Sequence, residues 1–513
     1  MHNLSRDLVK SNFAFPDDLK VSAAQEHLPE RVIQFGEGNF LRAFADWMFH
    51  QVNKQGFFNG RVVVVQPISD GTIDILNAQD GMYTLLLRGV RDGVISEEKE
   101  IITSVSRGIN PYVDWDGLLK CAENPDIEFV ISNTTEAGII YDQNDRLDMS
   151  PPSTFPGKLT AYLYHRFQHF NGASDKGMMI IPCELIDRNG DTLREAVVRL
   201  ADTWKLPQVF KQWLCKHNSF HNSLVDRVVT GYPKDEISVI EDRLGYRDQL
   251  MNTGELFHLW VIEGSKEFAE RLPFADIGLN VIWTKDISPY RTRKVRILNG
   301  AHTASAPVAF LSGLETVGDM MDHAVMRKYL RKIIYDEIIP SIELDKKMLT
   351  DFADSVMERF QNPFIKHYLL SILLNSSSKF KARILPSIFG YHKITGELPD
   401  TLIFSLASFI SLYKKGHIEG NGMRLRRDKG EFILRDDIPI LDFFVDTWKQ
   451  FDGSLDGALV VARAVLGNRT MWEQDLNHVS SLTEKTADYL HQIAGEGMLT
   501  TVTRLVGGGE GCL

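Results

Sequence analysis

Residues 30–40 read Glu30-Arg-Val-Ile-Gln-Phe35-Gly36-Glu-Gly38-Asn39-Phe40. The first six residues form a short, mostly apolar run, which predicts a buried β-strand that leads directly into two glycines. Aromatic and apolar residues then recur at helical spacing, at positions 40, 44, 47 and 48. A strand, a glycine turn and a helix in this order place a pyrophosphate on backbone amides. The stretch therefore predicts the first unit of a dinucleotide-binding domain.

The two glycines have separate roles in such a unit. Gly36 permits the tight turn, and Gly38 lets the backbone approach the phosphates. The third glycine of the usual Gly-x-Gly-x-x-Gly pattern is replaced by Leu41, so the motif is incomplete. An ordinary tight turn between a strand and a helix would also fit these residues.

A second buried strand is predicted for residues 61–65, Arg-Val-Val-Val-Val, about 25 residues after Gly36, which is a normal βαβ length. An acidic residue at the end of this strand usually accepts hydrogen bonds from ribose hydroxyls, and Asp70 is the nearest candidate. The turn contains no arginine that would attract a 2′-phosphate. NAD is therefore favoured over NADP as the cofactor.

Two more short apolar runs, at residues 127–131 and 178–181, predict further strands of a parallel sheet. The first leads into Ser132-Asn133-Thr134-Thr135-Glu136, and the second leads into a polar segment that ends at Asn189-Gly190. Polar residues that follow parallel strands gather at the carboxyl edge of the sheet, where ligands bind.

From about residue 290 the pattern changes to helical stretches with few strand signals, such as residues 368–374 and 402–412. We therefore expect an α/β protein in two domains. Residues 1–288 should form a Rossmann-type NAD-binding domain with a parallel sheet, and residues 289–513 a mostly α-helical domain that binds substrate and carries catalytic residues.

Composition narrows the class of protein. The 513 residues are 43% hydrophobic and 24% charged, as in globular proteins, and the net charge of −11 disfavours a nucleic-acid partner. The four cysteines are widely spaced without a Cys/His metal pattern, so no metal ligands are expected. No signal peptide and no apolar stretch of about 18 residues is present, which predicts a cytoplasmic protein without a membrane partner. No residue pattern indicates the oligomeric state.

The segment Lys294-Val-Arg-Ile-Leu-Asn299-Gly-Ala-His302 places a base, an amide and an imidazole at helical spacing. At about 100° per residue, Asn299 and His302 lie roughly 140° and 80° around an α-helix from Lys294, so all three can share one side. Nearby arginines at positions 291, 293 and 296 would lower the pKa of a lysine. The pattern fits proton transfer to a bound alcohol or carbonyl oxygen, although a basic helix with a packed histidine would fit it as well.

Six ordered motifs between about residues 30 and 390 resemble the polyol-specific long-chain dehydrogenases, the mannitol dehydrogenase family. They are Gly36-x-Gly38-x-Phe40-x-Arg42-Ala43, Asp80-Gly-Met-Tyr-Thr84, Thr135-Glu136-Ala-Gly138, Val225-Asp226-Arg227-Val228, Trp260-Val-Ile-Glu263 and Lys294-x4-Asn299-x2-His302. The resemblance implies a Rossmann-type domain, a helical C-terminal domain and metal-independent hydride transfer with NAD. The cofactor-binding residues expected from these segments are Phe35, Gly36, Gly38, Asn39, Phe40, Asp70, Asn133, Thr135 and Glu136.

The resemblance also implies roles for individual residues. Lys294 would be the general base in alcohol oxidation and the acid in ketone reduction, Asn299 would hold the alkoxide, and His302 would orient a substrate hydroxyl. Family members have a second amide two places after a cysteine that matches Cys183, where this chain has Leu185, so Asn189 is the substitute we consider. Asp226 would lie near the active site, although helix capping or an ion pair with Arg227 would also explain it.

The basic segment Lys379-Phe-Lys381-Ala-Arg383 resembles the region that carries the family's basic substrate contacts. A neutral polyol needs no net positive site, whereas a hexuronate carboxylate does. A solvated basic helix end would give the same pattern. The favoured hypothesis is an NAD-dependent oxidoreductase that interconverts a keto-hexuronate and its aldonate.

Alternatives are an enzyme for a related keto-hexuronate and a dehydrogenase for a neutral polyol such as mannitol or arabinitol. A nucleotide sensor with an inactive centre is disfavoured because Lys294, Asn299 and His302 are all present. A zinc-dependent alcohol dehydrogenase is disfavoured because no Cys or His residues have zinc-ligand spacing.

Overall fold

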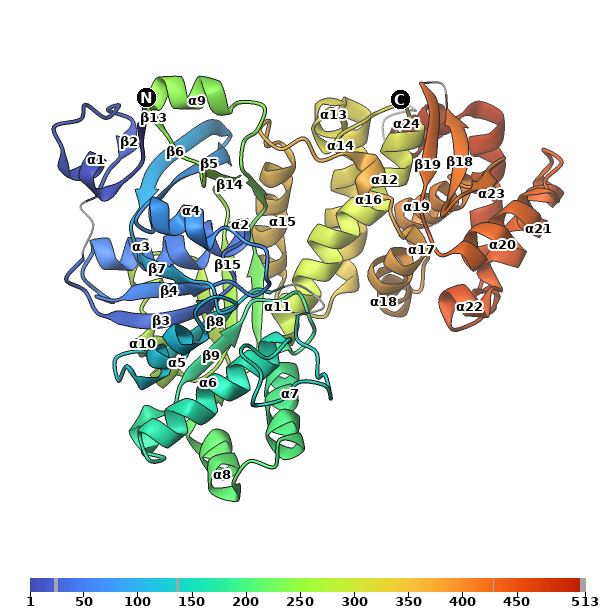
Figure 1. The fold of residues 1–513 in the computed structure, drawn as a ribbon. Coiled ribbons are helices and arrows are strands. Elements are labelled where there is room, and N and C mark those ends of the chain that lie inside the picture. The colour runs from blue at the N-terminus through green and yellow to red at the C-terminus, as the bar shows by residue number, and fades with distance from the viewer. Residues whose placement is uncertain (23–25, 135–137, 428, 508–513) are drawn as a thin grey trace. The chain divides into compact units, whose positions relative to one another are not determined.

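The computed structural model describes residues 1–22, 26–134, 138–427 and 429–507. The chain divides into two compact units, Met1–Ser288 and Pro289–Leu513 (Figure 1).

A six-stranded parallel sheet forms the centre of the first unit. Its strands, in spatial order, are β10 (Ser219–Phe220), β9 (Met179–Pro182), β8 (Phe129–Ser132), β3 (Glu30–Phe35), β4 (Arg61–Val65) and β7 (Val105–Ile109). Counted along the chain from β3, the order from the β7 edge is 3-2-1-4-5-6, which is the Rossmann order. The expected Rossmann-type domain with a parallel sheet is confirmed. The chain reverses direction across the sheet between β3 and β8, where such folds bind their ligands.

Both faces of this sheet are buried, because successive side chains of a strand point to opposite faces. On one face, Val32, Val62 and Phe129 pack with the apolar side of α3 (Ala45–Lys54). On the other face, Ile33, Val63 and Val130 pack with four helices. These helices are α5 (Trp115–Glu123), α6 (Phe155–His169), α7 (Asn189–Thr203) and α8 (Gln208–His217).

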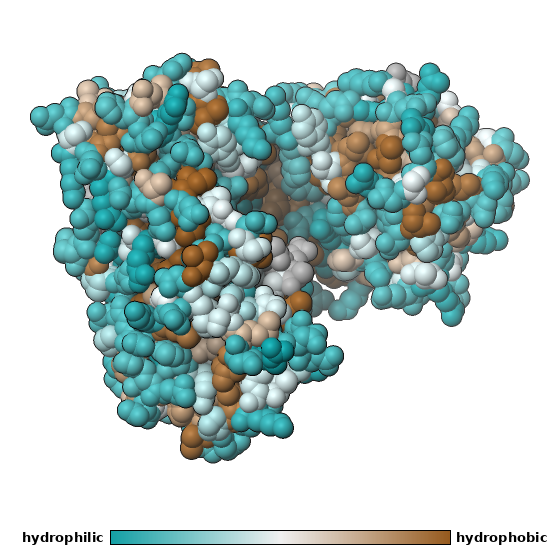
Figure 2. All heavy atoms as spheres, in the orientation of Figure 1, coloured by the Kyte–Doolittle hydropathy of each residue, from teal (hydrophilic) through white to brown (hydrophobic). Residues whose placement is uncertain are grey.

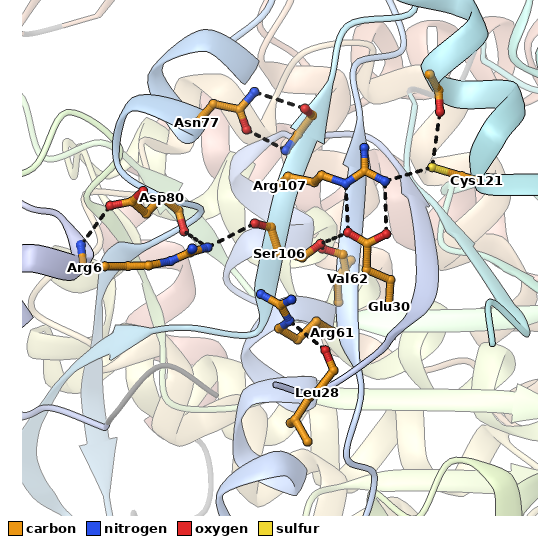
Figure 3. A network of polar contacts seen from close by, with 12 residues as sticks. Arg6, Leu28, Glu30, Arg61, Val62, Asn77, Asp80, Ser106, Arg107 and Cys121 are labelled. Atoms are coloured by element: carbon orange, nitrogen blue, oxygen red, sulfur yellow. Dashed lines mark hydrogen bonds and ion pairs between the residues drawn. The ribbon is translucent and has the colours of Figure 1, made fainter. Parts of the chain in front are cut away.

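A network of hydrogen bonds and ion pairs connects the β7 edge of the sheet to neighbouring elements (Figure 3). Arg107 of β7 donates from Nε and Nη2 to the two carboxylate oxygens of Glu30, at 2.8 and 3.0 Å. The hydroxyl of Ser106 donates to Glu30 at 2.9 Å and to the backbone oxygen of Val62 at 3.0 Å. Arg107 also lies 3.4 Å from the sulfur of Cys121 in α5. The network therefore joins the start of β3 to β4, β7 and α5.

Smaller sheets complete the first unit. One has the order β12 (Val229–Gly231), β14 (Asn252–Glu255), β5 (Tyr83–Arg91), β6 (Val94–Ile102) and β2 (Leu19–Lys20). Another has the order β11 (Ser223–Asp226), β15 (Leu259–Glu263) and β16 (Val281–Thr284), and β1 (His2–Asn3) pairs with β13 (Tyr246–Arg247). The remaining helices are α1 (Arg6–Lys10), α2 (Asn39–Arg42), α4 (Ile73–Ala78), α9 (Ile237–Leu244) and α10 (Lys266–Arg271).

The second unit is mostly helical, as expected. At its centre α12 (Gly300–Leu311) packs against α19 (Asp400–Ser411), and almost every residue of both helices is buried because both are apolar on all sides. The other helices of eight or more residues are α14 (Ala324–Arg331), α15 (Lys346–Phe360), α18 (Leu385–Thr395), α20 (Ile438–Trp448), α21 (Leu455–Leu466), α23 (Leu482–Glu496) and α24 (Met498–Gly507).

The second unit also contains a sheet that the sequence interpretation missed. Strands β17 (His417–Glu419), β18 (Gly422–Arg427) and β19 (Gly430–Leu434) form an antiparallel meander. Met423, Leu425 and Leu434 are buried, whereas Arg426 and Glu431 are exposed, so the alternation was present but short. The helix expected at residues 368–374 is reduced to α16 (Leu369–Ile372).

Hydrophilic residues cover most of the face shown in Figure 2. Within the part of the chain that the structure describes, no helix combines the length and the apolar character needed to cross a membrane.

Candidate active site

The glycine turn lies where β3 and β8 meet at the carboxyl edge of the central sheet. Gly36 has φ of +126°, and a Cβ atom there would lie 2.7 Å from the backbone oxygen of Asn133. The Gly36 N–H donates to the oxygen of Val65 at 2.9 Å, and the N–H of Asn133 donates to Phe35 at 3.0 Å. Only glycine satisfies both the backbone angle and this close approach.

Gly38 is different, because nothing in the protein requires it to be a glycine. Its φ of −66° and ψ of 165° suit any residue. A Cβ atom built at this position meets no described atom within 4 Å. The space beside Gly38 is therefore open, as a turn that receives a phosphate group must be.

The residues after the turn are held by Arg42. Its Nη2 donates to the Asn39 side-chain oxygen at 2.7 Å, its Nε donates to the backbone oxygen of Glu37 at 3.1 Å, and its Nη1 donates to Leu250. Phe40 stacks on Phe44 with ring centroids 4.9 Å apart. These contacts fix the start of α2, which was expected to contact the cofactor.

A buried carboxyl group lies beneath the same turn, and the sequence interpretation did not select it. The Gln34 side-chain nitrogen donates to the backbone oxygen of Gly36 at 3.0 Å and to Asp46 at 3.3 Å. The hydroxyl of Tyr83 donates to the backbone oxygen of Arg42 at 2.7 Å. Burial raises the pKa of Asp46 to about 7, so this group is mostly uncharged below neutral pH and ionises around it.

The turn after β4 contains Asp70, which is exposed. Gln66 shapes this turn by donating to the backbone oxygens of Ile68 and Ser69, both at 2.9 Å. The carboxylate of Glu37 lies beside Gly71, where a Cβ atom would collide with it, and burial raises the pKa of Glu37. Two acidic side chains, one exposed and one mostly buried, are therefore available near the end of β4.

Asn133 follows β8 and donates from its side chain to the backbone oxygen of Cys183 at 2.7 Å. Glu184, at the end of β9, accepts from the hydroxyl of Ser132 and from the backbone N–H of Thr134, both at 3.0 Å. Burial raises the pKa of Glu184. This carboxyl group, which the sequence did not single out, holds the segment after β8. Thr135 and Glu136 lie outside the described residues.

Asn189 and Asp226 also lie in the first unit. The Asn189 amide is committed to the backbone: its nitrogen donates to Pro182, Glu184 and Ser223, and its oxygen accepts from Gly190 and Ser223. These contacts use the hydrogen-bonding capacity of the amide within the protein, which argues against a second oxyanion amide at this position. Asp226 is buried at the end of β11, opposite Leu259 of β15.

In the second unit, the segment from Lys294 to Asn299 forms a π-helical turn between α11 (Ser288–Arg293) and α12. The angles expected for a regular α-helix therefore do not apply between Lys294 and Asn299. Single π-helical turns are rare and occur often at functional sites. Both side chains are partly exposed.

The arginines near Lys294 have partners of their own. Arg293 lies over the ring of Phe352, 4.4 Å from its centroid. Arg296 donates to the hydroxyls of Ser387 at 2.6 Å and Ser341 at 2.8 Å, and burial lowers its pKa to about 10. Both side chains therefore help to pack the π-helical turn.

His302 lies two residues into α12. Its ring stacks on Phe360 and meets His367 edge-on, with centroid distances of 4.1 and 4.9 Å. Its Nε2 is shielded from solvent and has no hydrogen-bond partner among the described residues. Burial lowers the pKa of His302 well below its usual value, and the charges of His367, Arg359 and Arg383 lower it further. The imidazole is neutral at neutral pH, and the hydrogen-bonding capacity of its Nε2 is not used by any described residue.

The three basic residues at 379–383 point to different partners. Arg383 donates to the hydroxyl of Thr303, next to His302, at 3.2 Å. Lys379 donates to the backbone oxygen of Ile372 at 2.9 Å, and burial, followed by the charge of Arg383, lowers its pKa. Lys381 forms a 2.8 Å ion pair with Glu473. Arg383 therefore lies close to the cluster of His302, Phe360 and His367, which we call the His302 cluster, and Lys379 lies near Arg383. Lys381 is paired with Glu473 instead.

Within the described ranges, no group of three or more His, Cys, Asp or Glu side chains is arranged to hold a metal ion. The residues of the second unit that the sequence selected for the reaction, Lys294, Asn299, His302 and Arg383, all carry nitrogen groups.

Related proteins have the same combination of domains. Altronate oxidoreductase of Bacillus subtilis is 46% identical over 483 residues, which cover 94% of this chain and 96% of that protein. Altronate oxidoreductase of Escherichia coli O6:K15:H31 is 47% identical over 478 residues, which cover 93% and 97% of the two chains. A Pseudomonas fluorescens mannitol 2-dehydrogenase, solved with NAD and D-mannitol, has the same fold with a TM-score of 0.70 and 21% identity, and covers 98% of this chain and 99% of its own.

Two family models cover most of the sequence. The mannitol dehydrogenase Rossmann domain matches residues 30–275. The mannitol dehydrogenase C-terminal domain matches residues 286–494. The chain belongs to the mannitol dehydrogenase family of oxidoreductases that act on CH–OH groups.

Proposed function

We propose that this protein is an NAD-dependent tagaturonate reductase, also called altronate oxidoreductase, which interconverts D-tagaturonate and D-altronate. The observation that carries the proposal is Arg383, a partly buried cation near His302 whose guanidinium donates a hydrogen bond to the neutral hydroxyl of Thr303. A buried cation of this kind suits a substrate carboxylate. The names of the relatives at 46–47% identity support the same substrate.

The cofactor is proposed to bind the first unit at the turn formed by Phe35, Gly36, Gly38, Asn39 and Phe40, with Asn133 beside it. The open space at Gly38 and the Rossmann strand order support this position. Asp70, or Glu37 next to it, would bind the ribose. Residues 66–72 contain no arginine, which favours NAD over NADP.

The second unit is proposed to supply the acid–base groups. NADH, when bound, is the source of the hydride in the reduction. The Lys294 ammonium donates a proton to the carbonyl oxygen of the keto acid, and in the reverse direction the neutral amine takes it from the alcohol. Asn299 donates a hydrogen bond to the same oxygen as negative charge develops. His302, which is neutral, orients a neighbouring hydroxyl through its unpartnered Nε2.

The carboxylate of the substrate is assigned to Arg383, with Lys379 as a second cation. Burial lowers the pKa of both groups, and among the described residues no carboxylate forms an ion pair with either of them. A bound carboxylate would stabilise their charged forms. Lys381 is the least suited of the three, because Glu473 neutralises it.

The alternatives are a fructuronate reductase and a mannitol- or arabinitol-type dehydrogenase. The loss of NADH absorbance with D-tagaturonate, D-fructuronate and D-fructose, repeated after a chelator, separates them. We expect the highest kcat/KM with D-tagaturonate and no effect of the chelator. A preference for D-fructuronate would reassign the substrate within the hexuronates, and a preference for D-fructose would refute the carboxylate site.

A further inference from the structure

A hollow on the second unit lies away from the His302 cluster. It has a volume of about 670 Å³ and is lined by the end of α12, by β18 and β19, and by α19, α20, α23 and α24. Leu311, the last residue of α12, reaches it. His302 is nine residues earlier in the same helix, which corresponds to about 14 Å at 1.5 Å per residue. The hollow is therefore separate from the groups assigned to the reaction.

Basic side chains dominate the polar lining of this hollow: Lys414, Lys415, Arg426 and Arg427. Arg427 is neutralised by Glu315 and also donates to the backbone oxygen of Phe310 at 2.9 Å. Lys414 lies 4.8 Å from the centroid of the Phe451 ring. Burial lowers the pKa of Lys414, and the charge of Lys415 lowers it further.

Three of these cations have no counter-ion among the described residues. Among the residues that the structure describes, no carboxylate pairs with Lys414, Lys415 or Arg426, and no described acidic residue lines the hollow. Asp428, which adjoins Arg427 in sequence, lies outside the described residues. These cations are therefore a local concentration of positive charge in a chain whose net charge is −11. Like charges around a concave surface repel one another, and an anion relieves that repulsion.

The rest of the lining is apolar and includes Phe432 and Trp448. Ligand sites typically enclose about 300–1,000 Å³ and combine apolar walls with a few charged groups, as this hollow does. A phosphate monoester carries about −1.5 to −2 charges at pH 7, which matches several cations better than one carboxylate does. We propose that the hollow is a second ligand site, which binds a small organic phosphate with an apolar or aromatic portion.

Phenyl phosphate is a suitable probe, and inorganic phosphate and benzoate serve as comparison ligands. Titration calorimetry would use the full chain with saturating NADH, so that the cofactor turn is occupied, at constant ionic strength. We expect phenyl phosphate to bind with a Kd below about 1 mM, and benzoate, which has the same ring and one charge, to bind at least about tenfold more weakly. Equal binding of the two probes would refute the preference for phosphate, and no binding of either would refute the site.

The double variant Lys415→Met/Arg426→Met removes two exposed cations from the hollow and should weaken phenyl phosphate binding at least about tenfold. Lys393→Met/Lys449→Met removes two exposed cations elsewhere on the second unit and should leave it unchanged. If both double variants lose the same affinity for phenyl phosphate, the net charge of the protein alone attracts the probe, and the proposal is overturned. Arg383→Met is the remaining control: if it abolishes binding, the phosphate occupies the proposed carboxylate site and the hollow is not a ligand site.

Discussion

The imidazole of His302 stacks on the ring of Phe360, with centroids 4.1 Å apart and planes inclined by 17°. The stack covers one face of the imidazole and, with His367 at its edge, keeps water from Nε2. Both effects favour the neutral ring, because a charged imidazolium would lose hydration without gaining a carboxylate partner. His302 is therefore suited to hydrogen bonding with a hydroxyl and poorly suited to donating a proton, which supports the proposal that Lys294 transfers the proton.

Lys294→Ala should abolish turnover while leaving NADH binding nearly intact. General acid–base groups typically contribute about 10² to 10⁴-fold to the rate, and Lys294 belongs to the second unit, whereas the glycine turn belongs to the first. Stopped-flow rates with D-tagaturonate and fluorescence titration with NADH measure the two effects. Lys346→Ala, an exposed lysine of the same unit, is the matched control. A residual rate above roughly a tenth of wild type would remove Lys294 from this role.

Gly38→Val and Gly36→Val should differ in folding stability, and the NADH affinity of the Gly38 variant tests the proposed cofactor site. The Gly38 variant should fold normally, because its new side chain meets open space, yet its NADH Kd should rise about tenfold or more because the phosphates are blocked. The Gly36 variant should lose stability as well, because φ of +126° and the oxygen of Asn133 both oppose a side chain. Thermal unfolding and NADH titration separate the two outcomes. Unchanged NADH affinity in folded Gly38→Val would place the cofactor elsewhere.

Much of the first unit could be predicted because its signals are local. The β4 run has four consecutive valines, and the β3 run leads directly into the glycine turn; the structure gives both strands the expected bounds, Glu30–Phe35 and Arg61–Val65. The β17–β19 meander was missed because its strands have three to six residues and few of them are buried. Strand alternation over so few residues is hard to separate from helical periodicity.

The site was harder to predict from sequence spacing. A π-helical turn replaces the expected regular helix at Lys294, and no local pattern distinguishes the two. Lys379, Lys381 and Arg383 look equivalent in sequence, whereas Glu473, about ninety residues later, pairs with Lys381 alone. Asn189 was considered as a substitute for the family amide that Leu185 replaces. Two of its five contacts with the backbone involve Ser223, which sequence spacing does not place beside it.

Asp46→Asn should make stability less dependent on pH. Burial raises the folded-state pKa of Asp46 from 3.8 to about 7, so its contribution is fully present below pH 3.8 and is lost as the pH rises through about 7. Asparagine cannot ionise, so the variant should become more stable relative to wild type between pH 5 and pH 8. Urea unfolding midpoints at both values measure this difference. Asp126→Asn, at an exposed position, is the control, and parallel shifts of Asp46→Asn and wild type would contradict the prediction.

Arg383→Met should change the choice of substrate, whereas Lys381→Met should not. A charged hydrogen bond to a carboxylate is worth about 1.5–3 kcal/mol, so losing it should lower kcat/KM for the keto-hexuronate roughly ten- to a hundredfold. Activity with D-fructose, however low, should change little, because that substrate has no carboxylate. Lys379→Met should have a smaller effect in the same direction, because its ammonium already donates to Ile372.

The quantity to compare is the ratio of the two kcat/KM values, because a general loss of packing lowers both together. If Arg383→Met keeps the wild-type ratio, the carboxylate is bound by other groups; if Lys381→Met alone changes it, Glu473 releases Lys381 when substrate binds.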